Sequence, residues 1–154
     1  MKDEDYLIGI GKIVGNLHAI EHLLRIFLCR ALGEQLTYPT AADKDVPLTS
    51  LTDYRSLSAI IAAYNARLGA AEQQFAADTD IVDIRDALAH GRTIADAPAF
   101  PITLYKFGRP VGARVPIERV DVLDESWLDH NRAHVRAQID KVVACAQGRG
   151  YKIG

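Results

Sequence analysis

Apolar residues recur every three or four positions from the start of the chain to about residue 32. Eight of them form one series: Tyr6, Ile10, Ile13, Leu17, Ile20, Leu24, Phe27 and Ala31. Steps of three and four residues place these side chains along one stripe of an α-helix. The pattern therefore predicts a long amphipathic helix over residues 3–32, with Gly33 as its stop.

Two shorter helices are predicted after a loop at residues 33–47, where two prolines interrupt any regular pattern. The first is expected over residues 49–68, and its apolar stripe consists of Leu57, Ile60, Ile61, Tyr64 and Leu68. The second is expected to begin at Asp78 or Thr79, either of which can cap a helix, and to run towards Ala95. Its stripe consists of Ile81, Ile84 and Leu88.

The pattern changes between residues 100 and 122, where β-forming residues alternate on both sides of a Gly/Pro-rich turn. Two such runs around a turn predict a β-hairpin, and Pro116 confines its second strand to the edge of a sheet. A last helix is expected over residues 124–148. The whole pattern predicts a mainly α fold, an antiparallel four-helix bundle with the hairpin inserted before the last helix, in a single domain of residues 1–154.

The composition is that of an ordinary globular protein, with 49% hydrophobic and 25% charged residues. The net charge of −2 gives no general attraction to nucleic acid, but the charge is unevenly spread along the chain. Residues 1–91 contain 8 Lys/Arg and 13 Asp/Glu, whereas residues 92–119 contain 5 Lys/Arg and 2 Asp/Glu. A local basic segment therefore begins at Arg92.

The first residues and the cysteines both favour a cytoplasmic protein. The chain begins with acidic residues, unlike a signal peptide, and no apolar run has the length of a membrane span. Cys29 and Cys145 lie far apart in the sequence, and neither has a partner at metal-ligand spacing. We therefore expect reduced cysteines packed as small apolar residues, with no disulfide framework and no membrane partner.

Two pairs of histidines have helical spacing. Residues 18–22 read His-Ala-Ile-Glu-His and match the inverted zinc-hydrolase pattern His-x-x-Glu-His. Both histidines leave the apolar face of a helical wheel and no further acidic ligand supports the match, so surface histidines are favoured over catalytic zinc. Glu21 stays near the edge of the apolar stripe, where it can hold an arginine from another helix. For the second pair, His130 and His134, a solvated helix face is favoured.

The densest cluster of ionisable residues consists of Arg85, Asp86, His90 and Arg92. Asp86 and His90 are four residues apart, so the carboxylate can hold the imidazole. Arg85 and His90 lie about 140° apart around a regular helix, on opposite sides of the buried stripe. They can meet at one phosphate through a distortion near Gly91 or through a second copy of the helix across a symmetric interface. An exposed helix end, where basic residues suit the dipole, explains the same residues without a site.

The spacing Arg85-x-x-x-x-His90, with Asp86 after the arginine and Ala89 and Gly91 around the histidine, resembles the signature of HEPN-domain proteins. The resemblance implies a small four-helix bundle and, in many members, a metal-independent endoribonuclease that works as a dimer. It implies that His90 is the acid/base residue, that Arg85 binds the phosphate, and that Asp86 orients them, with no metal and no cofactor. It also implies RNA as a partner, a homodimer, and a toxin role that a nucleotidyltransferase-type antitoxin often neutralises.

The chemistry of these side chains fits RNA cleavage. RNA supplies its own nucleophile in the 2′-hydroxyl, so a histidine can move the protons without a metal. The planar donors of arginine can bind the phosphate and the charge that develops on it. Candidates to hold the RNA backbone are Arg92, Lys106, Arg109 and Arg114. Tyr105 or Phe107 can stack a base, although a folding or dimer-contact role explains the hairpin equally well.

Two other classes of function stay open. A HEPN-like domain can bind nucleic acid, nucleotides or another protein without cleaving anything, and a helical interaction module would bind no RNA at all. Growth arrest on expression, relieved by Arg85→Ala or His90→Ala, would favour the ribonuclease over both alternatives.

Overall fold

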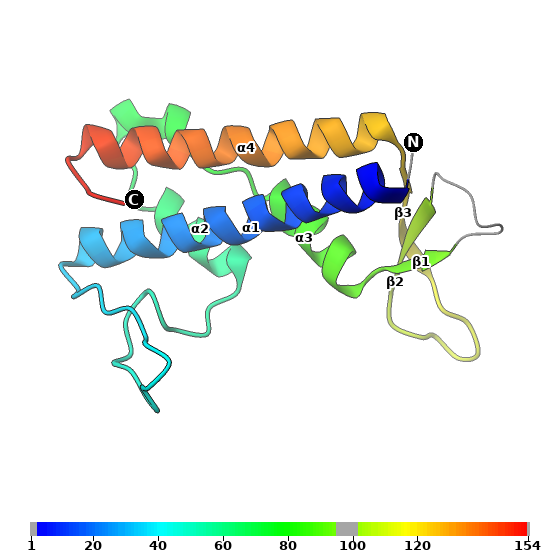
Figure 1. Cartoon of the computed structure of the whole chain (residues 1–154), viewed down its shortest axis with the longest axis horizontal. Coiled ribbons are helices and arrows are strands. Elements are labelled where there is room, and N and C mark those ends of the chain that lie inside the picture. The colour runs from blue at the N-terminus through cyan, green and yellow to red at the C-terminus, as the bar shows by residue number, and fades with distance from the viewer. Residues whose placement is uncertain (1–2, 95–101, 154) are drawn as a thin grey trace. The chain divides into compact units, whose positions relative to one another are not determined.

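The computed structural model describes residues 3–94 and 102–153 (Figure 1). The α-helices are α1 (Asp3–Leu32), α2 (Leu57–Asn65), α3 (Asp80–His90) and α4 (Glu125–Gly148), and a 3-10 helix, η1, covers Ala70–Phe75. The strands are β1 (Arg92–Ile94), β2 (Ile102–Phe107) and β3 (Ile117–Leu123). Within these residues, no helix combines the length and the apolar character that crossing a membrane requires.

The chain forms two compact units, each of which contains part of α1 and part of α4. The sheet unit consists of Met1–Leu17 and Asp80–Val135, and the helical unit consists of His18–Thr79 and Arg136–Gly154. The three strands and α3 belong to the sheet unit, whereas α2 and η1 belong to the helical unit.

The sheet unit contains an antiparallel sheet of three strands in the order β1-β2-β3. The predicted fold class, a mainly α four-helix bundle with an inserted two-stranded hairpin, is therefore wrong. The two predicted strands exist as β2 and β3, and β3 is an edge strand, as Pro116 requires. The additional strand is β1, whose residues the hydrophobic pattern assigned to the end of the third helix. The helices are also unequal, because α2 and α3 have nine and eleven residues against thirty in α1.

Gly91 explains why α3 stops before the predicted end at Ala95, a residue that itself lies outside the described part of the chain. The Gly91 N–H donates to the carbonyl of Ala87 at 2.8 Å, and the chain then enters β1. A Cβ atom at position 91 would lie 2.6 Å from Leu104 Cδ1 and would collide with the carbonyl oxygen of Ala87. Only glycine therefore lets the end of α3 approach β2 so closely.

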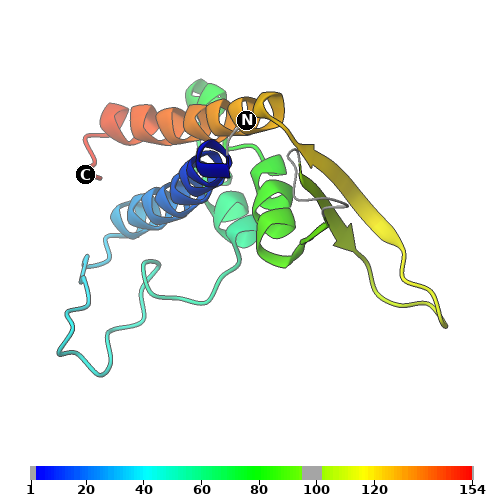
Figure 2. The same ribbon diagram turned by 45° about the vertical axis from the view of Figure 1, so that its right-hand side comes forward.

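The core of the sheet unit covers one face of the sheet. Leu104 of β2 and Leu123 of β3 are buried, as are Ile84 and Ala87 of α3. Figure 2 shows α3 beside the sheet and the turn between β2 and β3 extending away from that helix. The next element, α4, begins as predicted because the carboxylate of Asp124 accepts a hydrogen bond from the backbone N–H of Trp127 at 2.8 Å.

The helical unit is built around aromatic and aliphatic side chains of α1 and α2. Phe27 and Tyr64 are fully buried, and their rings meet edge to face with centroids 4.7 Å apart. The first predicted helix is confirmed as α1, which ends at Leu32 before Gly33 with its positive φ of 69°. The second is shorter than predicted, because Ser56 caps α2 and residues 49–53 form turns.

Candidate functional site

The three predicted catalytic residues lie along α3, outside its buried stripe. Arg85 and His90 are exposed and Asp86 is half-buried. The buried side of α3 consists of Ile81, Ile84 and Ala87, so Ala87 takes the place expected for Leu88. Because the core of the sheet unit uses none of the three polar side chains, all of them remain at the surface for chemistry or binding.

Arg85 and Asp86 form the pair at the centre of this motif. Arg85 Nη1 donates to Asp86 Oδ1 at 2.9 Å, and the two side chains are 46% and 33% exposed. An exposed ion pair of this kind adds little to stability. Its effect is to direct the guanidinium of Arg85 towards Asp86 beside α3.

His90 is the last residue of α3 and is open to solvent. Within residues 3–94 and 102–153, no side-chain hydrogen bond or ion pair involves its imidazole. The expected pairing of Asp86 with His90 is absent, because Asp86 accepts from Arg85 instead. A hydrogen bond from a charged guanidinium to a carboxylate is among the stronger hydrogen bonds in proteins.

The helix remains regular through the motif, so Arg85 and His90 point about 140° apart. The distortion near Gly91 falls after His90 and does not bring the two side chains together. One copy of α3 therefore offers an arginine and a histidine on two sides of the helix.

A groove of about 320 Å³ lies elsewhere in the sheet unit, at the first turns of α1 and α4. It is lined by Asp5, Ile8, Gly9, Lys12, Glu125, Leu128, Asp129 and Arg132. None of the motif residues lines it.

The four residues predicted to hold the RNA backbone divide into three groups. Arg92 lies on β1, with its guanidinium carbon 5.6 Å from the centroid of the Phe107 ring. Lys106 is turned to the other face of the sheet and pairs with Glu118 at 3.9 Å. Arg109 and Arg114 are exposed in the turn between β2 and β3. Arg92 is thus the residue that the structure joins to an aromatic side chain.

Glu21 belongs to the helical unit and binds an arginine of its own helix, not of another helix as expected. Arg25 donates to Glu21 Oε1 from Nε at 3.1 Å and from Nη2 at 3.0 Å. The i, i+4 spacing of the two residues is the local signal for this pair. Arg25 also donates to Ser50, Asp53 and Arg55, and no sequence pattern predicts these contacts. Glu21 therefore supports a loop of the helical unit.

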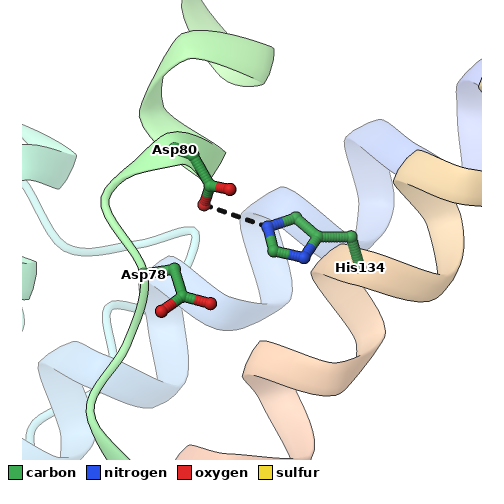
Figure 3. A group of neighbouring side chains, drawn as sticks. All are labelled: Asp78, Asp80 and His134. Atoms are coloured by element: carbon green, nitrogen blue, oxygen red, sulfur yellow. Dashed lines mark hydrogen bonds and ion pairs between the residues drawn. The ribbon is translucent and has the colours of Figure 1, made fainter.

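His18, His22 and His130 are exposed, as favoured, whereas His134 is half-buried, so the second pair does not form a fully solvated face. The ring of His22 lies beside that of Tyr38, with centroids 6.1 Å apart. The rings of His130 and His134 stack at 6.3 Å, and His134 Nε2 lies 3.0 Å from Asp80 Oδ1 (Figure 3). Asp78, also drawn in Figure 3, belongs to the helical unit and accepts a hydrogen bond from Gln138 at 2.7 Å.

No known protein family matches the sequence, and no curated protein or solved structure matches it either.

Proposed function

We propose that the protein is a metal-independent endoribonuclease whose Arg85 and His90 act on RNA at an interface between two copies of the chain. The observation that carries the proposal is the state of the motif on α3. Arg85 is oriented by Asp86, and His90 is exposed and uses neither ring nitrogen in a hydrogen bond within the described residues. An imidazole left open in this way can accept and return protons.

In the proposed reaction, the imidazole of His90 takes the proton of a 2′-hydroxyl, whose oxygen attacks the adjacent phosphorus. The bond from phosphorus to the 5′-oxygen breaks, and a water molecule donates a proton to that oxygen. The products are a 2′,3′-cyclic phosphate and a free 5′-hydroxyl. Arg85 binds the non-bridging oxygens of the phosphate, where negative charge develops. Asp86 keeps Arg85 in position and does not itself exchange a proton.

The second copy supplies what one helix lacks. Since Arg85 and His90 point about 140° apart on α3, they cannot both face one phosphate from the same helix. Across a two-fold axis, the arginine of one copy can face the histidine of the other. The two-fold axis then creates two equivalent pairs, and in each pair the His90 of one copy acts as the base beside the Arg85 of the other.

The decisive experiment measures cleavage of a fluorescently labelled RNA by purified wild type and by His90→Ala. We expect the variant to lose about 10²- to 10⁴-fold in rate, the usual contribution of acid–base catalysis. Excess chelator should leave the wild-type rate unchanged. The matched control is His130→Ala, which removes another exposed histidine of the sheet unit and should cleave like wild type. Cleavage by His90→Ala at the wild-type rate, or activity that a chelator abolishes, would contradict the proposal.

Two further observations test the same proposal in different ways. Light scattering should give the mass of a dimer at micromolar concentration, and a monomer would contradict the composite site. In a bacterial host, expression should arrest growth if the protein acts as a toxin, and Arg85→Ala should relieve the arrest.

A second candidate function is RNA binding without cleavage. It is favoured by the Arg85–Asp86 pair, because an arginine held by a carboxylate of its own helix can bind a phosphate whether or not His90 takes part. This candidate predicts that wild type binds RNA and leaves it intact.

A further inference from the structure

The sheet has one buried face and one open face, and the register of the strands assigns each residue to its face. Leu104 pairs with Thr93 on one side and with Asp121 on the other, so these three share the face that Leu104 buries. The residues between them point the other way, since side chains alternate along a strand. This open face consists of Arg92, Ile94, Thr103, Tyr105, Phe107, Ile117, Val120 and Val122.

The centre of the open face is an aromatic pair with an arginine over it. The rings of Tyr105 and Phe107 are stacked, with centroids 6.2 Å apart and planes 17° apart. Arg92 pairs with Tyr105 across the β1–β2 ladder, and its guanidinium carbon lies 5.6 Å from the centroid of the Phe107 ring. Two near-parallel rings beside a planar cation form a surface on which another flat, electron-rich ring can stack.

The remaining residues of the open face are uncharged and, apart from Thr103, apolar. Val120 and Ile117 are 52% and 55% exposed, which is unusual for large aliphatic side chains in a sheet. The face contains no acidic residue, so Arg92 is its one charge and has no carboxylate partner there. By contrast, the arginine on the buried side of β3, Arg119, is neutralised by Asp121.

The charge of the adjoining turn has the same sign. Arg109 and Arg114 are exposed between β2 and β3, and no described residue forms an ion pair with either of them. Among the residues that the structure describes, the open face and the turn therefore present three positive charges without an ion-pair partner around a largely apolar surface. An occupant that matches this pattern combines negative charge with exposed aromatic faces.

We infer that the open face binds single-stranded RNA, whose bases stack on Tyr105 and Phe107 while Arg92, Arg109 and Arg114 bind the phosphates; this inference rests on the proposed function. A single strand is required because the base faces of a duplex are already stacked inside it. A second copy of the chain fits less well. Two open faces placed together would bring two Arg92 side chains into one apolar contact without a carboxylate between them.

The position of Arg92 connects this face to the motif. Arg92 follows His90 by two residues, a length of chain that spans at most about 7 Å. A strand that crosses the open face at β1 therefore passes the end of α3. The open face thus selects and binds single-stranded RNA, whereas Arg85 and His90 carry out its cleavage.

The test is a fluorescence-anisotropy titration of the full chain with a labelled 2′-O-methyl oligouridine. This probe keeps the bases and phosphates but lacks the free 2′-hydroxyl, so binding is measured without cleavage. We expect Tyr105→Leu, which preserves apolar bulk, to weaken binding about 5- to 100-fold, as loss of one stacking platform does elsewhere. The matched control, Tyr54→Leu, removes a fully exposed tyrosine of the helical unit and should bind within about twofold of wild type. Arg92→Gln should weaken binding and reduce its salt dependence.

Wild-type affinity in both Tyr105→Leu and Phe107→Leu would overturn the inference, as would equally tight binding of a duplex with the same backbone. A change in mass by light scattering without a change in RNA affinity would show that the face is a contact between copies, which also overturns it. The proposed cleavage can be disproved independently of RNA binding by the open face. If His90→Ala cuts RNA like wild type while Tyr105→Leu loses affinity for the probe, the open face binds RNA but His90 is not catalytic.

Discussion

Arg25 of the helical unit differs in its surroundings from Arg85 and Arg92 of the sheet unit. In the helical unit, Arg25 is 11% exposed and donates to five acceptor atoms, which belong to Glu21, Ser50, Asp53 and Arg55. In the sheet unit, Arg85 is 46% exposed and has one carboxylate partner, Asp86, while Arg92 lies over an aromatic ring. The guanidinium of Arg25 thus donates hydrogen bonds that stabilise the fold. Within the described residues, most N–H groups of the Arg85 and Arg92 guanidinium groups donate none.

The difference shows which charges hold the structure together. Residues 50–55 form no helix or strand, so their carbonyl groups need donors from elsewhere in the chain. Arg25 supplies those donors and so ties this segment to α1. Burial by itself would raise the pKa of Asp53, but hydrogen bonds from Arg25 and Arg55 hold that pKa below its ordinary value. The carboxylate is therefore kept charged by the arginines that it helps to position.

The motif and the open face are held by packing instead. Gly91 places the end of α3 against Leu104, and Ile84 and Ala87 fill the buried side of the helix. No ion pair of Arg85 or Arg92 reaches from one secondary-structure element to another among the described residues. Arg85 and Arg92 are thus available for binding or chemistry, and substituting them should leave the fold intact.

The substitution with the largest expected effect is Arg25→Met. Removing the guanidinium leaves Asp53 and the loop carbonyls without donors in a largely buried place, so the free energy of unfolding should fall by about 3–5 kcal/mol. The matched change, Arg85→Met, removes an exposed arginine and should alter stability by no more than about 0.5 kcal/mol. Urea denaturation of both variants and wild type measures the difference. Equal losses in the two variants would remove the distinction between the units.

The contacts of Arg25 also mark the limit of what the sequence reveals. Periodicity locates α1 and its end at Gly33, because a thirty-residue amphipathic stripe is a strong local signal. Three of the five acceptors of Arg25 are backbone carbonyls that lie 25 to 30 residues away, and carbonyls have no sequence signature. Periodicity also predicts that Arg85, Asp86 and His90 are helical, as in α3, but the partner of Asp86 depends on which side chains come close in three dimensions.

The missed strand has a similar physical origin. Arg92, Thr93 and Ile94 are too few to show the alternation of a strand, and they continue the polar and apolar spacing of α3. Their conformation is decided by pairing with residues 103–105 of β2, which follow about ten residues later. The open face could therefore not be assembled from the sequence, although Tyr105 and Phe107 were recognised as possible stacking residues.

Gly91→Ala tests whether packing alone positions the motif. The added Cβ meets the backbone of Ala87 and the side chain of Leu104, so α3 and β2 must move apart at a cost of about 1–3 kcal/mol. The control is Gly11→Ala in α1, where a Cβ has no neighbour within 4 Å and should stabilise the helix by about 0.5–1 kcal/mol. Thermal unfolding should therefore shift in opposite directions for the two alanines. A shift in the same direction would mean that the close approach at Gly91 is easily relaxed.

The smallest expected effect is a change in how stability depends on pH. It concerns Arg149, a second arginine of the helical unit that donates several hydrogen bonds. Arg149 Nε donates to Glu72 Oε1 at 2.8 Å, and this bond, with one from the N–H of Gly69, lowers the pKa of Glu72 from 4.5 to about 2. A carboxyl whose pKa is lower in the folded protein stabilises it fully above pH 4.5 and loses that effect as the pH falls towards 2.

Glu72→Gln removes the titrating group, so its melting temperature should decline less than that of wild type between about pH 5 and pH 3. In an Arg149→Met background the guanidinium that lowers the pKa of Glu72 is missing, and the same substitution should change the pH dependence far less. Parallel pH profiles for wild type and Glu72→Gln would mean that the bond with Arg149 does not hold the carboxylate charged. Arg149 would then resemble Arg85 and Arg92. The hydrogen bonds that an arginine donates would no longer show whether its charge stabilises this protein.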